Sequence, residues 1–173
     1  KIEPMLAKQV TTYFEEILRS NGKIERFIDS DYTYMNHTLA KWIYRREDIR
    51  GARLRKVKLD DPRRGGIFTQ PGLMTATANG VDTSPVMRGV WVLENVLGTP
   101  PAPPPPDVEP LPVDTREATS IRERLDLHRK NEACFSCHAK IDPMGFAFEN
   151  FDVVGRWRDK YKRAKEPIDT SAT

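Results

Sequence analysis

The spacing of apolar residues at the start of the chain predicts an amphipathic helix over residues 2–18. These residues recur three or four positions apart, as one face of a helix requires. They are Ile2, Met5, Leu6, Val10, Phe14, Ile17 and Leu18. The Asn21-Gly22 pair that follows is a good stop signal, so the helix is expected to end before it.

One further helix and several less regular segments follow. Residues 49–58 are interpreted as a loop leading into a short strand, and residues 60–66 as a turn. Residues 67–83 are rich in Gly and Thr and are expected to be irregular. Residues 36–45, before them, predict a second helix whose inner face holds Leu39, Trp42 and Ile43.

Ser84 and Pro85 open the next predicted helix, because serine is a favoured N-cap and proline suits the first helical position. Gly98 is a natural C-cap for it. The proline-rich residues 100–112 then predict an extended, semi-rigid polyproline II segment, either a plain linker or a strap across the surface. The apolar positions of the helix are Val86, Val90, Leu93, Val96 and Leu97.

A charged helix is predicted over residues 116–130, after the proline-rich segment. Ile121, Leu125 and His128 lie on one side of it. Aromatic surface follows in the remaining residues, supplied by Phe146, Phe148, Phe151 and Trp157.

The bulk composition excludes some classes of protein. The chain has 173 residues, enough for one domain with a real core or for two small lobes. With 38% hydrophobic and 31% charged residues it is too polar for a membrane protein, and no apolar run approaches the roughly 20 residues that span a bilayer. A net charge of only +3 gives no general electrostatic reason to bind nucleic acid. The Lys/Arg cluster of residues 156–165 is interpreted as a solvated face, with a docking patch for an acidic partner as the alternative.

The ends of the chain and its cysteines add two expectations. Because the sequence begins at Lys1 and shows no signal peptide, we expect it to be a fragment or a processed form of a longer protein. The two cysteines, Cys134 and Cys137, sit in one short motif, so no separate disulfide framework is expected.

The cysteine motif indicates the chemistry of the chain. Residues 134–138 read Cys-Phe-Ser-Cys-His, the spacing with which c-type haem is attached. Two cysteines on one turn of helix can each form a thioether to a haem vinyl group, and the adjacent histidine then points its imidazole at the iron. The sequence therefore predicts one covalent haem held by Cys134 and Cys137, with His138 as an iron ligand.

Two other uses of such a cysteine pair fit this chain less well. A structural zinc site usually needs four ligands in two pairs, and the sequence has no second Cys/His pair. A thioredoxin-type redox pair follows a strand in a βαβ unit, whereas this pair follows a predicted helix.

A proline shortly after the motif has two interpretations. In c-type cytochromes a backbone carbonyl near such a proline often accepts the Nδ1–H of the ligating histidine, which fixes its tautomer and makes it more basic. Pro143 or its neighbours could do this for His138. A simple turn at Pro143 explains the residue equally well.

Several stretches of the sequence resemble a known family, the large planctomycete-type c-type cytochrome proteins. The chain is similar to the C-terminal part of these proteins. In that family the pattern usually has Asn-Pro at positions 131–132 and Leu or Ile at position 144, where this chain has Asn131-Glu132 and Met144. The matching stretches are residues 31–36 with 39–40, 65–67 with 72–73, 83–89 with 91–95, the proline-rich segment, 128–129, 134–138, 141–149, 151–152 and 155–158.

The resemblance implies an exported, haem-binding protein of the periplasm or cell envelope, normally longer at both ends. With the helical pattern it predicts a mainly α fold, in which a cytochrome c-like haem lobe is joined by a proline-rich strap to an N-terminal helical lobe. The expected boundaries are residues 1–98 for the mostly helical N-terminal region, 99–113 for the strap and 114–173 for the haem-binding region.

The sequence leaves the sixth iron ligand open. His128 is the first candidate, because it precedes Cys134 by six residues and belongs to the family motif. The family's usual proline implies a helix break at Asn131, which would let His128 fold over the haem. Met74 and Met87 come next, and an open or water-bound iron is the remaining alternative. Weaker candidates are Met5, Met35, Met144 and His37.

Three functions are compatible with one attached haem. An electron-transfer module, exchanging electrons with a redox partner protein or with adjoining domains, is the default. A haem enzyme, peroxidase-like or oxidative, would need an open distal site and a distal acid/base pair, for which Arg88 with Asp82 is the best candidate. In the third function, the protein is a structural domain whose fold the attached haem mainly stabilises.

Overall fold

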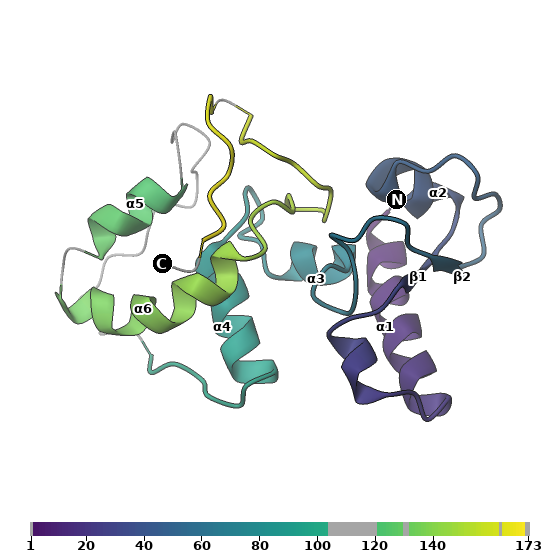
Figure 1. Ribbon diagram of the computed structural model, residues 1–173, viewed down its shortest axis with the longest axis horizontal. Coiled ribbons are helices and arrows are strands. Elements are labelled where there is room, and N and C mark those ends of the chain that lie inside the picture. Colours follow the sequence, from purple (N-terminus) through teal and green to yellow (C-terminus); the bar gives the residue numbers. More distant parts are fainter. Residues whose placement is uncertain (1, 104–120, 130–131, 163, 172–173) are drawn as a thin grey trace. The chain divides into compact units, whose positions relative to one another are not determined.

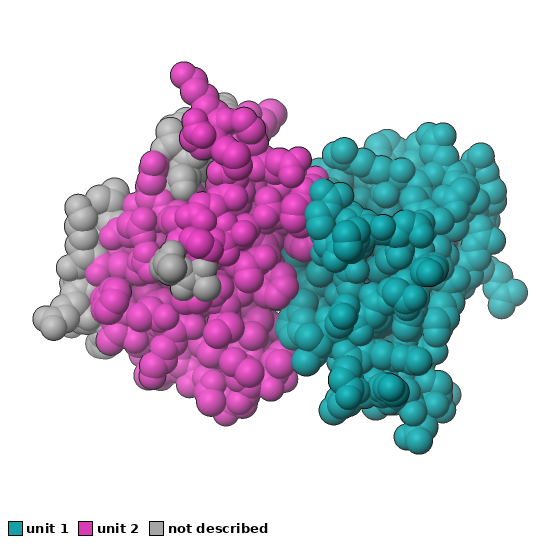
Figure 2. Space-filling model, in the orientation of Figure 1, with its two compact units in different colours: residues 1–76, 154–156 teal, residues 77–153, 157–173 magenta. Residues whose placement is uncertain are grey.

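The computed structural model describes residues 2–103, 121–129, 132–162 and 164–171, and this part of the chain is mostly helical, as expected (Figure 1). The chain divides into two compact units (Figure 2). Unit 1 comprises residues 1–76 and 154–156, and unit 2 comprises residues 77–153 and 157–173. No helix within the described ranges is long and apolar enough to cross a membrane.

Helix α1 (Glu3–Arg19) begins unit 1 and has proline in its first turn. It begins and ends one residue later than predicted, and its buried face differs from the expected one. Phe14 and Leu18 are 43% and 60% exposed, whereas Gln9 is fully buried. The Gln9 amide is accommodated because its Nε2 donates to Thr33 Oγ1 at 3.2 Å and to Tyr44 Oη at 2.8 Å. These partners come from distant parts of the chain, so the apolar pattern of α1 alone does not reveal them.

A small antiparallel sheet pairs β1 (Tyr32–Met35) with β2 (Arg55–Lys58), with Tyr32 opposite Lys58 and Met35 opposite Arg55. Strand β2 lies where a short strand was predicted, whereas β1 was not predicted. The short helices η1 (Ile24–Phe27) and α3 (Pro71–Ala76) complete the unit, and α3 lies in a stretch that was expected to be irregular.

The predicted second helix is present in an altered form. Helix α2 (His37–Leu39) continues into a π-helical turn, η2 (Ala40–Tyr44). Leu39 and Ile43 are buried as predicted, but Trp42 is 61% exposed, so its inner placement was wrong. The wider π turn changes the angular spacing of side chains and moves Trp42 away from the core face.

Unit 2 contains α4 (Pro85–Asn95), α5 (Ile121–His128) and α6 (Glu132–Phe146). Its core joins Ile121, Leu125 and Phe146 from α5 and α6. The start of α4 follows the prediction, because Ser84 Oγ accepts the Met87 N–H at 3.3 Å.

Helix α4 packs closely on α6, so it belongs to unit 2 although the sequence grouped residues 77–98 with the N-terminal region. The strap predicted over residues 99–113 lies mostly outside the described residues, since residues 104–120 are not described. It stays a prediction.

Candidate functional site

The Cys-x-x-Cys-His motif lies in the first half of helix α6. Residues i, i+3 and i+4 of a helix share one face, so Cys134, Cys137 and His138 project to the same side of α6. Cys134 is buried, Cys137 is half-buried, and neither forms a disulfide. The helix thus presents two thiols and an imidazole side by side.

His138 is held by a side chain on its own helix. Its Nδ1 lies 2.8 Å from Oδ1 of Asp142, one turn further along α6. The Asp142 side chain is only 1% exposed, and its second oxygen, Oδ2, is buried and makes no hydrogen bond to the described residues. With Nδ1 engaged in this way, Nε2 is the nitrogen that His138 presents for coordination.

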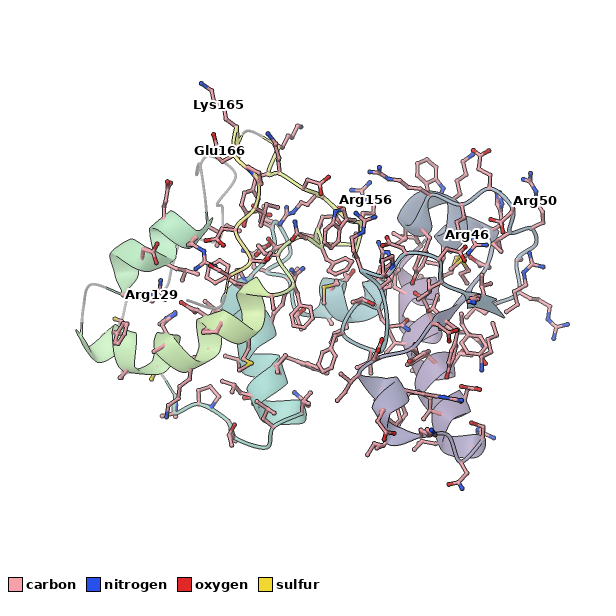
Figure 3. The ribbon with its side chains drawn as sticks, viewed as in Figure 1. Arg46, Arg50, Arg129, Arg156, Lys165 and Glu166 are labelled. Carbon is pink, nitrogen blue, oxygen red and sulfur yellow. The ribbon has the colours of Figure 1, made fainter. Side chains whose placement is uncertain are left out.

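Arg129, just after α5, supplies the counter-charge. Its Nε lies 3.9 Å from Asp142 Oδ2, and its guanidinium also pairs with the exposed Asp126. The Arg129 side chain lies between α5 and α6 (Figure 3). Together these contacts order three groups, with the imidazole of His138 next to the carboxylate of Asp142, and that carboxylate next to the guanidinium of Arg129.

Pro143, the residue predicted to mark either a carbonyl acceptor or a simple turn, lies inside α6, which continues to Phe146. The partner observed for His138 Nδ1 is the carboxylate of the neighbouring Asp142. Proline has no N–H and cannot make the usual helical bond to Ala139, yet the helix continues past it. Because the helix does not break there, residue 142 stays one turn above residue 138.

Tight packing against α4 fixes the position of α6. A Cβ added to Gly145 would overlap the carbonyl oxygen of Pro85, and a Cβ added to Gly89 would overlap that of Ile141. Both glycines are therefore required for the backbones of the two helices to approach. Helices α4 and α6 therefore contact each other closely at two points, at Pro85 with Gly145 and at Gly89 with Ile141.

Unit 2 also contains an ionic network formed by Arg88, Glu149 and Arg158. Arg88 Nη1 donates to the carbonyls of Phe148 and Phe151 at 2.9 and 3.1 Å and lies 3.8 Å from Glu149 Oε1. Arg158 Nη2 donates to the same Glu149 oxygen at 2.7 Å. Burial raises the pKa of Glu149, and the two guanidinium groups oppose this rise.

This network changes the interpretation of Arg88 and Asp82 as a distal acid/base pair. The Arg88 side chain is 1% exposed and its guanidinium binds backbone carbonyls and Glu149. Asp82 lies 3.9 Å from Arg158. Both residues therefore contact the loop that follows α6, where they hold the fold together.

The predicted distal ligands fall in different places. His128 ends α5, but its side chain lies outside the described part of the chain. Met87 is 45% exposed on α4, two residues from both Pro85 and Gly89, which face α6, so it points away from α6. Met144 is 38% exposed on α6. The other candidates, Met5, Met35, Met74 and His37, belong to unit 1.

In unit 1, Met35 and Met74 are buried core residues. His37 Nδ1 lies 3.1 Å from the carbonyl oxygen of Ile49. Across the described ranges, no group of three or more His, Cys, Asp or Glu side chains lies close enough to hold a metal ion.

Sequence reasoning missed two residues of the site region, Asp142 and Glu149. A signal for Asp142 was available, because an acidic residue four positions after the ligating histidine shares its helical face. The interpretations of this segment were a backbone carbonyl near Pro143 as the partner of Nδ1 or a simple turn, and neither involves a side chain. Glu149 gave no local signal, since its partners Arg88 and Arg158 come from separate segments.

The structure thus defines a helical domain in which a Cys-x-x-Cys-His helix is anchored by a neighbouring helix and a buried charge network. Comparison with known protein families identifies the family of this domain. The family model PSCyt3, protein of unknown function (DUF1588), matches residues 64–161. The chain belongs to this family of planctomycete cytochrome-type domains. No curated protein and no solved structure matches the chain.

Proposed function

We propose that unit 2 is a c-type cytochrome domain in which Cys134 and Cys137 would bind one haem covalently and His138 would be a ligand of its iron. The observation that carries this proposal is the common face of α6 on which the two thiols and the imidazole lie. Membership in a cytochrome-type family supports it.

The residues present fit this group. Both cysteines are free thiols, and each can add across one vinyl double bond, its sulfur to one carbon and its hydrogen to the other. The carboxylate of Asp142 engages Nδ1 of His138, so Nε2 is the nitrogen that would hold the iron. When bound, the haem supplies one-electron chemistry at its iron.

Electron transfer is the function that these features favour. The domain would exchange electrons with a redox partner protein or with adjoining domains of a larger exported protein, in the periplasm or cell envelope. A haem enzyme is less well supported, because Arg88 and Asp82 are committed to contacts within the fold. Carbon monoxide tests this alternative, since rapid binding to the reduced protein marks an open distal site.

Covalent attachment is the first test of the proposal. The chain, matured in a periplasm with the c-type haem assembly machinery, is expected to gain the mass of one haem, which survives acid–acetone extraction. The double variant Cys134→Ser, Cys137→Ser is expected to lose that haem because it lacks both thiols. Haem that washes out of the unaltered chain, or zinc bound in its place, contradicts the proposal.

The sixth ligand is the second test. We propose His128, for which the short spacing to Cys134 is the motivation. Two imidazoles stabilise ferric iron better than an imidazole and a thioether, so a low reduction potential and no thioether-to-iron absorption in the far red are expected. His128→Ala should give a high-spin spectrum and rapid carbon monoxide binding, whereas His37→Ala in unit 1 should change neither. A low-spin spectrum that persists in His128→Ala excludes His128.

A further inference from the structure

We infer that Asp142 is a positioning residue that lowers the reduction potential of the iron through His138, and that Arg129 limits this effect. The inference rests on the proposed function. It goes beyond it by assigning the control of the potential to two residues outside the Cys-x-x-Cys-His motif. It starts from the contact between His138 Nδ1 and Asp142 Oδ1, which are 2.8 Å apart.

The burial of Asp142 distinguishes this contact from an ordinary helix-surface pair. Exposed pairs of charged residues one turn apart are common on helices and stabilise them only slightly. Asp142 is instead 1% exposed, and its Oδ2 is buried with no hydrogen-bond partner in the part of the chain that the structure describes. A carboxylate is costly to bury unless it is paired. The charge of Asp142 is therefore paired with His138 and Arg129, the two side chains that lie beside it.

A carboxylate that accepts the Nδ1–H of a metal-bound histidine fixes the ring and makes it a stronger electron donor. A backbone carbonyl near Pro143, one of the two alternatives that the sequence left open, is neutral and would have a weaker effect. A stronger donor stabilises ferric iron relative to ferrous iron and so lowers the potential. The negative charge of Asp142 close to the ligand acts in the same direction.

Arg129 acts in the opposite direction. Its Nε lies 3.9 Å from Oδ2 of Asp142, the oxygen that does not face His138. A guanidinium at this distance draws the charge of the carboxylate toward itself and away from the imidazole. Arg129 also pairs with Asp126, an exposed residue of α5, so its position is held from both helices.

The test is the reduction potential of the haem-loaded protein and of its variants, measured by spectroelectrochemistry. Asp142→Asn keeps an oxygen that can accept the Nδ1–H but removes the charge, and should raise the potential. Loss of a side chain that supports a metal ligand typically costs about tenfold or more in metal affinity or activity. We expect a change of about tenfold in the ratio of oxidised to reduced protein, which is about 59 mV for one electron. Asp142→Glu should retain most of the low potential, and Arg129→Gln should lower it further.

Asp126→Asn is the matched control, because it removes the same charge from an exposed partner of Arg129. It should leave the potential nearly unchanged. An Asp142→Asn protein that carries covalent haem and keeps the potential of the unaltered protein overturns the inference while the proposed function stands. Equal shifts in Asp142→Asn and Asp126→Asn also overturn it, since they show a general charge effect. If the unaltered chain attaches no haem, the proposed function itself fails.

If Asp142→Asn does not fold, the reduction potentials of Asp142→Glu and Arg129→Gln are compared with that of the unaltered protein instead. Far-UV circular dichroism of each haem-loaded variant verifies folding independently of the potential. A potential in Arg129→Gln that stays the same or rises contradicts the assigned role of Arg129 and Asp142.

Discussion

Replacing Gly145 with Ala is expected to destabilise unit 2 by about 3 kcal/mol, the upper range for overpacking a well-filled interior. The added Cβ would overlap the carbonyl oxygen of Pro85, which is backbone and cannot swing aside. Helices α4 and α6 would have to separate, and the separation would displace the helix that carries Cys134, Cys137 and His138. Urea unfolding followed by circular dichroism measures the effect.

The expected loss of stability has the opposite sign to the effect of helix propensity alone. In a helix without close neighbours, Gly→Ala stabilises by about 1 kcal/mol, because alanine has the higher helix propensity. The reverse substitution, Ala139→Gly, at an exposed position of the same helix measures that propensity alone and should cost about 1 kcal/mol. A Gly145→Ala protein that is more stable than the unaltered chain would show that the two helices do not approach as described.

Removal of the Arg88 guanidinium is expected to have the other large effect. Arg88→Met keeps most of the side-chain volume but removes the guanidinium that donates to the carbonyls of Phe148 and Phe151 and that is one of the two lying beside Glu149. Breaking a buried ion pair from one side costs about 3–5 kcal/mol. Arg158 still pairs with Glu149 in this variant, but the two buried carbonyls lose the donation from Arg88 as well. We expect a loss of this size in the free energy of unfolding, measured by urea denaturation.

Two further variants separate the causes. Arg88→Lys keeps the charge but loses the planar fork that reaches several acceptors, so an intermediate loss is expected. Lys140→Met removes a positive charge from an exposed position of α6 and should change the stability by less than about 0.5 kcal/mol. A loss in Arg88→Met no greater than in Lys140→Met would refute a structural role for the network.

Some parts of the site could be predicted from sequence because their causes are local. The cap at Ser84-Pro85 depends on neighbouring residues only, and the structure confirms it. The helix that carries the cysteine motif likewise brings Cys134, Cys137 and His138 to one face by its own geometry. The covalent haem and its distal ligand stay predictions.

Other features had partners too far away in the sequence to be inferred. Gly89 and Gly145 look like helix-weakening residues until α4 and α6 are brought together. Arg88 resembled one half of a distal acid/base pair until its guanidinium was seen against backbone carbonyls and Glu149. The local pattern describes only which face of an element is apolar, and says nothing of which backbone approaches it.

Asp142 stands between these two cases. Its distance from His138 is set by one helical turn, so the pairing follows once α6 is known to continue past Pro143. By itself the sequence determined the mainly helical class, the start of α4 and the order of thiols and imidazole, because these depend on neighbouring residues. Only the tertiary structure decided that α6 runs unbroken, that Asp142 is buried and that Arg129 faces it, because burial and charge pairing depend on segments that meet only in the folded chain.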